Sequence, residues 1–336
     1  MDKTRVGVIG VGHLGRLHAS LYREVDDAYL VGIYDVDTEK LKKVAEELQV
    51  SVFENMDSLI KQVDAINIVT PTITHFEIAL KALEQGKHVF LEKPITYKED
   101  EARMLIEAAA KNNCKIQVGH IERFNSALLA LEDVALDPLF IEAHRLASFN
   151  PRGTDVAVIL DLMIHDLDLI LHLVKSKPVH IDASGVGVIS STIDIANARI
   201  EFENGCVANV TASRISAKKM RKMRIFQKNA YISLDFADGF SEIFFIPSEN
   251  QMPFHDGTLA FSLGQIDEGE NKREIKYNRL QRSNTNPLKS ELSHFVDAIR
   301  NDIPVPVSAE DGLEALRLAN QVLQKIESHR IKIKEI

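Results

Sequence analysis

A lysine that follows a short apolar segment is the first residue whose setting suggests chemistry. Lys93 stands between Glu92 and Pro94, directly after the apolar run 88–91. If that run is a strand of an open α/β sheet, Lys93 lies beyond its carboxyl end, where such sheets bind ligands. Pro94 also restricts Lys93 to an extended conformation. The pattern favours a lysine held in a ligand site over a solvated lysine at a strand end.

A polar stripe on an otherwise apolar helix is the second candidate. The ionisable residues in the segment 157–174 are Asp161, His165, Asp168 and His172. On an α-helix their spacing confines them to about 60° of arc. Such an apolar helix is expected to be buried, and buried ionisable groups need partners or a ligand. Three interpretations stay open: an Asp161–His165 pair for acid–base catalysis, a shared metal ion, or a structural network. For Asp168 and His172 the structural interpretation is favoured.

A glycine pattern predicts a dinucleotide site. Residues 10–15 read Gly-Val-Gly-His-Leu-Gly between a strand-like run and a helical pattern, and Asp35 follows the last glycine by 20 residues. The glycines allow a tight turn, close approach of a pyrophosphate and close helix packing, and the helix N-terminus attracts the phosphates. Asp35 would bind the adenosine ribose hydroxyls and, with Asp37 nearby, repel a 2′-phosphate. No arginine follows Asp35 directly, so NAD is favoured over NADP, and a turn that binds nothing is disfavoured.

Strands and helices alternate through the first 120 residues. Apolar runs predict strands at 4–9, 29–34, 65–69, 88–91 and 116–118. Helical periodicity predicts helices at 13–25, 39–48, 76–84 and 99–111. Capping boxes at Thr74 with Glu77 and at Thr96 with Glu99 support two of the helix starts. The alternation predicts a doubly wound α/β domain, in which helices cover both faces of a parallel sheet.

After Arg123 the pattern changes to an antiparallel α+β type. An apolar helix is predicted at 157–174, and strands are predicted at 180–189, 197–202, 206–213, 223–227 and 231–236. Asn204-Gly205 predicts a hairpin. Residues 250–287 suggest a loop or a weak hairpin, and two helices at 288–300 and 309–328 close the chain. The predicted domains are a dinucleotide-binding domain, 1–121, and a substrate-binding and oligomerisation domain, 122–336.

Composition excludes several classes of protein. The 336 residues are 45% hydrophobic and 26% charged, which is typical of a globular protein of about two domains. The net charge of −9 disfavours nucleic-acid binding through phosphate attraction. The two cysteines, Cys114 and Cys206, are expected to be structural thiols in a reducing cytoplasm. Neither a signal peptide nor an apolar stretch of the ~18 residues that span a membrane is recognisable, so a cytoplasmic protein is expected.

Taken together, the motifs resemble those of the Gfo/Idh/MocA oxidoreductases over the whole chain. The residues that carry the resemblance are Gly10–Gly15, Asp35, Glu92-Lys93-Pro94, Val118-Gly119-His120, Arg123-Phe124-Asn125, Asp161 with His165, Glu291-Leu292 with Phe295, and Ser308–Gly312. The resemblance implies a Rossmann domain followed by a large open antiparallel sheet. It also implies that Lys93 lies beside the nicotinamide, that Asp161 and His165 act on the reacting hydroxyl, and that residues Thr70, Pro71 and His75 form the nicotinamide-side loop.

A narrower resemblance concerns the substrate. Segments 140–146, 151–155, 194–199 and 212–214 resemble the subgroup containing UDP-N-acetylglucosamine 3-dehydrogenases. These enzymes oxidise the sugar 3-hydroxyl to a 3-keto sugar for a partner aminotransferase, on the pathway to 2,3-diamino-sugar lipid A. The diphosphate of a nucleotide sugar favours arginine ligands, and the candidates are Arg123, Arg152 and Arg214, each with a salt bridge as the alternative. Many relatives act on free sugars or inositols, which stay open as substrates.

These inferences combine into an NAD-dependent dehydrogenase of a sugar hydroxyl. The expected catalytic residues are Lys93, Asp161 and His165, which are predicted to converge across the interdomain cleft. His165 serves as general base oriented by Asp161, and Lys93 stabilises the developing alkoxide. The expected cofactor-binding residues are Gly10, Gly12, His13, Leu14, Gly15, Asp35, Thr70, Pro71, His75, Glu92 and Lys93. The expected substrate-binding residues are Arg123, Asn125, Arg152, Asp161 and His165.

Other expectations concern partners and alternatives. No resident metal is expected, and a homodimer or homotetramer is expected by analogy with the family. The rival from another class is an NAD-binding regulator without turnover, because the family contains ligand-sensing co-regulators. The presence of Lys93, Asp161 and His165 argues against it, since a sensor need not keep a proton-transfer set.

Overall fold

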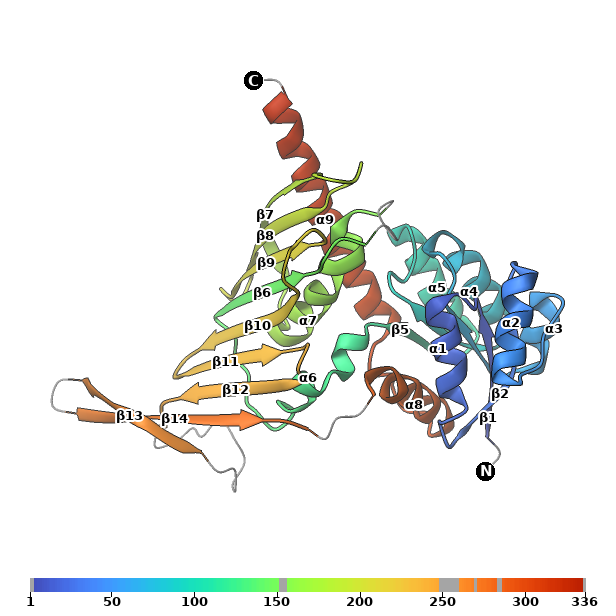
Figure 1. The fold of residues 1–336 in the computed structure, drawn as a ribbon, viewed down its shortest axis with the longest axis horizontal. Coiled ribbons are helices and arrows are strands. Elements are labelled where there is room, and N and C mark those ends of the chain that lie inside the picture. Colours follow the sequence, from blue (N-terminus) through green and yellow to red (C-terminus); the bar gives the residue numbers. More distant parts are fainter. Residues whose placement is uncertain (1–2, 151–155, 248–259, 269–270, 283–285, 335–336) are drawn as a thin grey trace. The chain divides into compact units, whose positions relative to one another are not determined.

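The computed structural model describes residues 3–150, 156–247, 260–268, 271–282 and 286–334 (Figure 1). Contacts divide the chain into two compact units. The first unit comprises residues 1–124 and 285–316, and the second comprises 125–284 and 317–336. The first unit therefore includes a segment close to the C-terminus that the sequence-based division, 1–121 and 122–336, assigns to the second domain.

A parallel sheet forms the centre of the first unit. Its strands are β1 (Thr4–Ile9), β2 (Ala28–Tyr34), β3 (Ala65–Ile68), β4 (His88–Glu92) and β5 (Ile116–Gly119). Their order is β2-β1-β3-β4-β5 and every pairing is parallel. The residues of β3 and β5 are buried throughout, as expected for strands that helices cover on both faces. The predicted doubly wound arrangement is confirmed, and the strand order reverses between β1 and β3, at a topological switch point.

The helices of the first unit follow the predicted pattern with one addition. They are α1 (His13–Tyr22), α2 (Thr38–Leu48), α3 (Met56–Gln62), α4 (His75–Glu84), α5 (Glu99–Lys111) and α8 (Pro287–Arg300), with the 3-10 turns η1 (Thr72–Thr74) and η2 (Ile121–Phe124). The addition is α3, whose seven residues are too few to show a periodic pattern. The Asn55 side chain caps α3 by accepting a hydrogen bond from the Ser58 N–H at 2.9 Å.

The two predicted capping boxes are not present as such. The Thr74 hydroxyl donates to the Pro71 carbonyl at 2.8 Å and does not cap α4. The Thr96 hydroxyl donates to the Lys98 carbonyl at 2.6 Å, and α5 begins later, where the Glu101 carboxylate accepts from the Lys98 N–H at 3.2 Å. In both places the threonine hydroxyl donates to a backbone carbonyl of the turn before the helix and does not accept from the first N–H groups of the helix. Threonine can form either kind of local hydrogen bond, so the residue type alone does not predict which one forms.

Helix α8 joins the core of the first unit although it is distant from it in sequence. Leu292, Phe295 and Val296 are at most 1% exposed and lie in one cluster with the residues of α1 and β1. Phe295 packs edge-on against Phe90 of β4, with ring centroids 5.8 Å apart. The apolar stripe of α8 explains why it needs a buried face, but not which unit supplies that face.

A broad mixed sheet forms the second unit (Figure 1). Its strands are β6 (Phe140–Leu146), β7 (Pro178–Val186), β8 (Ile195–Phe202), β9 (Val207–Ser213), β10 (Met220–Gln227), β11 (Ala230–Asp235), β12 (Phe240–Phe245), β13 (Phe261–Glu268) and β14 (Asn271–Leu280). Their order is β13-β14-β12-β11-β10-β6-β9-β8-β7. The predicted antiparallel pairing holds for most neighbours, but β6 and β9 pair in parallel. The Asn204-Gly205 hairpin between β8 and β9 is confirmed, and Gly205 has a φ of +86°.

Several strands of this sheet differ from prediction. The sequence pattern does not predict β6 or β12. In the segment 250–287, β13 and β14 pair in antiparallel fashion, which agrees with the weak hairpin and not with the loop among the two predicted alternatives. Residues alternate along β6: Ile141 is buried, whereas Phe140 and Glu142 are half-buried. The half-buried and exposed positions on this face carry a row of aromatic rings across neighbouring strands, with centroids 5.0 to 5.7 Å apart. Its members are Phe140, Phe226, Tyr231, Phe244 and Tyr277.

The apolar helix of the second unit is not a continuous α-helix. A π-helical segment, η3 (Ile159–Met163), precedes α7 (Ile164–Val174). Bonding between residues five apart changes the rotation per residue, so the predicted 60° arc does not apply to Asp161. The remaining helices are α6 (Ser126–Leu129) and α9 (Ala309–Lys334), which extends from the first unit into the second. Within the residues described, no helix is both long enough and apolar enough to cross a membrane.

Candidate active site

The predicted site residues of the first unit follow the carboxyl ends of its strands. The glycine loop follows β1, Asp35 follows β2, Thr70-Pro71 follows β3, and Lys93 follows β4. Because the strands are parallel, these positions share one edge of the sheet, and the switch point between β1 and β3 lies there. Open α/β sheets bind ligands at this place.

The glycine loop has the shape that a pyrophosphate needs. Gly10 has a φ of +86°, and a Cβ on Gly15 would lie 1.8 Å from the Gly10 carbonyl oxygen. A Cβ on Gly12, in contrast, would have no heavy atom within 4 Å. Gly10 therefore makes the turn, Gly15 permits the close packing of α1, and the backbone at Gly12 is open to a ligand. The first N–H groups of α1, around His13 and Leu14, have no acceptor within the helix and can bind phosphate oxygens.

Asp35 braces this loop. One carboxylate oxygen accepts from the Val11 N–H at 2.7 Å, and the other accepts from the Asp37 N–H at 2.9 Å. These bonds hold the carboxylate at the end of β2, beside the glycine loop. The geometry fits the predicted role of Asp35 toward a ribose, because a carboxylate can accept further hydrogen bonds at its remaining lone pairs.

A buried histidine links the loops that follow β3 and β4. His75 is 1% exposed; its Nδ1 lies 3.0 Å from the Pro94 carbonyl and its Nε2 lies 2.9 Å from the Thr70 carbonyl. Burial lowers the pKa of His75, although the two carbonyls act in the opposite direction. A neutral imidazole donates from one nitrogen only, so His75 donates to one of these two carbonyls at a time. Its ring lies between the Thr70 loop and the segment that carries Lys93 and Pro94, whose peptide bond is cis.

A chain of polar groups, buried except for its last member, ends at Glu92, the residue before Lys93. His18 on α1 is 1% exposed, and its Nε2 is 3.1 Å from Oε1 of Glu92. Its Nδ1 is 3.1 Å from the amide nitrogen of Asn67, whose oxygen accepts from the Tyr22 hydroxyl at 3.0 Å. The motifs do not single out His18, Asn67 or Tyr22. The available signal is a histidine three residues after the last glycine, on the face of α1 that packs against the sheet.

The predicted substrate ligands near the unit boundary have structural partners. Arg123 is 8% exposed and its guanidinium lies 3.7 Å from the Asp311 carboxylate. The Asn125 side chain caps α6 by accepting from the Ala127 N–H at 3.0 Å, and it donates to the Phe236 carbonyl at 3.0 Å. These contacts account for the burial of both side chains without a ligand, and their roles toward substrate stay predictions.

Of the other two arginines predicted to bind substrate, the structure describes only Arg214. Arg152 lies outside the described residues. Arg214 is 4% exposed, lies 3.8 Å from the Asp194 carboxylate and donates to the Val156 carbonyl. Asp194 also accepts from three successive N–H groups, those of residues 188–190. These hydrogen bonds outweigh the effect of burial and hold the pKa of Asp194 well below its ordinary value. Arg214 and Asp194 thus anchor the chain just before η3.

Asp161 and His165 belong to the second unit. Asp161 lies in the π-helical segment and His165 in the first turn of α7, and both side chains are half-buried. Asp168, one turn further on, is 1% exposed, as expected for a structural residue. π-helical segments occur frequently at functional sites, and this one carries one of the two predicted members of the acid–base pair.

A buried ion pair holds the start of α7 against β6. Asp166, the residue after His165, accepts two hydrogen bonds from the Arg145 guanidinium, both of 2.9 Å. The two side chains are only 5% and 3% exposed. A bidentate pair has a defined geometry, so it sets the position of the first turn of α7.

We expect Asp166→Asn to destabilise the protein by about 3–5 kcal/mol, because it leaves the buried Arg145 charge without its counter-ion. Urea unfolding followed by circular dichroism measures this loss. Glu142→Gln, on the same strand, is the control: its partner is the half-exposed Arg224 at 2.8 Å, and such a pair contributes up to about 1 kcal/mol. Equal losses in the two variants would contradict the expectation.

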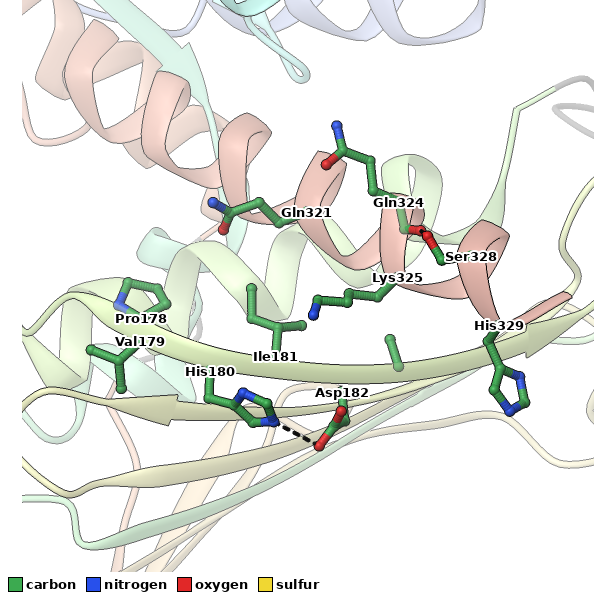
Figure 2. Close-up of a pocket in the computed structure, with 11 residues that line it drawn as sticks. Pro178, Val179, His180, Ile181, Asp182, Gln321, Gln324, Lys325, Ser328 and His329 are labelled. Carbon is green, nitrogen blue, oxygen red and sulfur yellow. Dashed lines mark hydrogen bonds and ion pairs between the residues drawn. The ribbon is translucent and has the colours of Figure 1, made fainter. Parts of the chain in front are cut away.

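A polar groove elsewhere in the second unit holds none of the predicted site residues. It has a volume of about 560 Å³ and lies between the edge strand β7 and α9. Figure 2 shows His180 and Asp182, joined at 3.0 Å, below Lys325 of α9. In the part of the chain that the structure describes, no group of three or more His, Cys, Asp or Glu side chains is placed to hold a metal ion.

Comparison with known proteins agrees with this geometry. The family model "Oxidoreductase family, NAD-binding Rossmann fold" of Gfo/Idh/MocA matches residues 4–120, and the Gfo/Idh/MocA C-terminal domain model matches residues 141–233. UDP-N-acetylglucosamine 3-dehydrogenase from Acidithiobacillus ferrooxidans is 38% identical over 329 residues, which cover 98% of this chain and 99% of that protein. A solved structure of the A. ferrooxidans enzyme superposes with a TM-score of 0.87 at 36% identity, over 98% of this chain and 99% of the other.

A second relative has a different substrate. The myo-inositol 2-dehydrogenase of Thermotoga maritima is 26% identical over 352 residues, which cover 99% of each chain. Both relatives are named as dehydrogenases, and the two family models match the expected parts of the sequence. The chain therefore belongs to the Gfo/Idh/MocA family of oxidoreductases and is a dehydrogenase with an N-terminal NAD-binding Rossmann fold.

Proposed function

We propose that this dehydrogenase oxidises the 3-hydroxyl of UDP-N-acetylglucosamine with NAD, giving the 3-keto sugar, NADH and a proton. The observation that carries the proposal is the 38% identity, over nearly the whole of both chains, to an enzyme named for this reaction. The inositol dehydrogenase matches as fully but at 26% identity. A sugar hydroxyl on a nucleotide carrier is therefore favoured over an inositol hydroxyl.

The chain's own residues supply binding and proton transfer. The glycine loop and the N-terminus of α1 bind the pyrophosphate, and Asp35 binds the adenosine ribose. NAD, when bound, accepts the hydride from the carbinol carbon. His165 takes the hydroxyl proton and is oriented by Asp161, while Lys93 donates a hydrogen bond to the oxygen and stabilises the developing alkoxide. The fully open backbone at Gly12 and the braced Asp35 support the cofactor part of this proposal.

A spectrophotometric assay of NADH formation tests the function. The protein is mixed with NAD and UDP-N-acetylglucosamine, and a keto-sugar aminotransferase with glutamate is added because alcohol oxidation alone can be uphill. We expect NADH only when the nucleotide sugar is present. Parallel reactions contain free N-acetylglucosamine, glucose 6-phosphate, and myo- or scyllo-inositol. NADH formation with an inositol and none with the nucleotide sugar would replace the proposed substrate.

The choice of NAD over NADP is proposed to depend on Asp35. We expect Asp35→Ser to raise the ratio of kcat/KM for NADP to that for NAD by about 10- to 100-fold, because hydrogen bonds to a charged group contribute roughly 1.5–3 kcal/mol. Asp37→Ser is the matched control: Asp37 caps α2 through the Lys40 N–H at 3.0 Å, and serine also caps helices well. Steady-state kinetics with both cofactors measure the ratio. A similar rise in the control would show that general charge near the loop, and not Asp35, selects the cofactor.

The cellular setting is part of the same proposal. We infer a cytoplasmic homodimer or homotetramer whose keto product passes to an aminotransferase that makes the 2,3-diamino sugar of lipid A. The aromatic row across β6, β10, β11, β12 and β14 supports an assembly, because aromatic rings are enriched in protein interfaces. Sedimentation analysis of the purified protein measures the number of subunits.

A further inference from the structure

The polar groups that end at Glu92 form a chain of hydrogen bonds. Burial and the nearby Glu291 hold the pKa of Tyr22 well above its ordinary value, so its hydroxyl stays a donor. It donates to the Asn67 amide oxygen at 3.0 Å, which turns the amide N–H₂ group toward Nδ1 of His18 at 3.1 Å. Nδ1 of His18 lies 3.1 Å from the Asn67 amide nitrogen and 3.4 Å from the amide oxygen, so the Asn67 amide holds this side of the ring. On the other side of the ring, Nε2 faces the Glu92 carboxylate at 3.1 Å and donates to it.

The Glu92 carboxylate is held through both of its oxygens. One oxygen accepts from Nε2 of His18 at 3.1 Å. The other carboxylate oxygen accepts from the Lys93 N–H at 3.2 Å. Burial alone would raise the pKa of Glu92, but the hydrogen bond and charge of His18, together with the charge and the backbone N–H of Lys93, outweigh burial, and the pKa lies below its ordinary value. Glu92 is therefore a carboxylate that bonds to the backbone of the residue proposed to stabilise the alkoxide.

The carboxylate has little room to take another position. Its carbon and oxygen atoms lie 3.0–3.1 Å from the place where a Cβ on Gly119 would stand, so the absence of a side chain on β5 makes space for it. On the other side, the His18 ring packs edge-on against Phe90, with centroids 5.6 Å apart. The titratable groups that face Glu92 are His18 from α1, Lys93 from the end of its own strand, and His75 from α4. Close packing thus fixes the direction of the His18–Glu92 bond.

We infer that His18 is a positioning residue for Lys93: with Asn67 and Tyr22 on its other side, it orients the half-buried Glu92 carboxylate, so that Glu92 holds the Lys93 backbone in place. The inference deepens the proposed function and rests on it for the role of Lys93. It concerns residues of α1, β3 and β4 within one unit. Because His18 lies three residues after Gly15, the helix that starts at the pyrophosphate loop also sets the environment of Lys93.

His18→Leu is the diagnostic variant. Without the hydrogen bond from His18, Lys93 alone opposes the effect of burial, and the pKa of Glu92 is expected to rise. The carboxyl group then takes up a proton at a higher pH than in the unchanged protein, which weakens its hydrogen bond with the Lys93 N–H. We expect kcat to fall by about 10- to 100-fold, as for other residues that orient a functional group, while KM for NAD changes less than threefold. The acidic limb of the pH profile of kcat/KM should move to higher pH and become steeper.

Two further variants separate this role from simple packing. His18→Gln keeps an N–H donor that does not titrate, and it should restore at least half of the lost kcat and the original acidic limb. His88→Leu removes another partly buried imidazole at the opposite end of β4, where it accepts from the Lys115 N–H at 3.0 Å. It should leave kcat and the limb unchanged. Equal losses in His18→Leu and His88→Leu, with an unshifted limb in both, would overturn the inference.

An infrared measurement tests the inference without any substrate. Protonated Glu92 has a carboxyl C=O stretch that a carboxylate lacks. Difference spectra between acidic and neutral pH should show this band at higher pH in His18→Leu than in the unchanged protein, and the band should be absent from the His18→Leu/Glu92→Gln double variant. A band at the same pH in both proteins would overturn the inference. If no sugar is turned over but the band moves as expected, the proposed substrate fails while the link between His18 and Glu92 holds.

Discussion

Lys93→Met is expected to lower kcat for NADH formation from UDP-N-acetylglucosamine by about 10²- to 10³-fold, the usual cost of removing one donor that stabilises a developing oxyanion. Methionine has nearly the length of lysine but no charge and no N–H. It therefore removes the hydrogen bond to the reacting oxygen and leaves the backbone at Pro94 and the His75 contact with its carbonyl in place. The loss should appear in kcat and kcat/KM alike, which is the signature of an interaction made in the transition state.

The control for Lys93→Met is Lys98→Met. Lys98 precedes α5, five residues further along the chain, and its side chain is 70% exposed. It should turn over at the rate of the unchanged protein. Isothermal titration calorimetry should find NAD affinity within a factor of about three for both variants, since the pyrophosphate and ribose sites are untouched. A Lys93→Met protein that retains more than a tenth of the original kcat would contradict the proposed role.

His165→Ala is expected to lower kcat by about 10²- to 10⁴-fold, the range for loss of a positioned general base. The variant should also lack the acidic limb of the pH profile of kcat, because that limb reports protonation of the base. Added imidazole should restore part of the activity if the half-buried position of His165 admits it. Steady-state rates between pH 5 and 9, with and without imidazole, measure both effects.

His172→Ala is the matched control for this prediction, because it removes an exposed imidazole from the same helix two turns further on. It should change kcat by less than twofold. The double variant Lys93→Met/His165→Ala gives a further test. If the two side chains serve the same step, their effects on kcat are not additive, and the kcat of the double variant is close to that of the less active single variant. Fully additive losses would show that they act on separate steps.

Much of the first unit was accessible to sequence reasoning because its signals are local. The central parallel strands are mostly buried, so their sequences are nearly continuous apolar runs, and the predicted strands agree with the observed ones within one or two residues. The glycine loop depends on backbone geometry that glycine alone permits, as the φ of Gly10 and the contact at Gly15 show. The Asn204-Gly205 hairpin was likewise predictable, because Gly205 has a positive φ that glycine adopts readily.

The features that the sequence analysis predicted wrongly or missed depend on contacts between segments that are distant in the sequence. The π-helical segment at Ile159–Met163 has the apolar composition of an α-helix, so the sequence pattern does not distinguish the two. The parallel pairing of β6 with β9 joins strands about 60 residues apart and leaves no mark on either segment. The affiliation of α8 with the first unit likewise depends on a core formed by residues nearly 300 positions earlier.

For the candidate site the division is similar. Types and spacing along the chain were sufficient to nominate Lys93, Asp35 and the glycine loop, because each follows the end of a strand and a parallel sheet brings those ends to one edge. The His18–Asn67–Glu92 chain was not accessible in this way. Its members come from a helix and two strands, and hydrogen bonds between them are decided by distances of about 3 Å that exist only after the sheet and α1 have packed. The sequence by itself therefore identifies the candidate catalytic and cofactor-binding residues. Which side chains form hydrogen bonds with them is decided only by the tertiary structure, because these bonds depend on packing between distant segments.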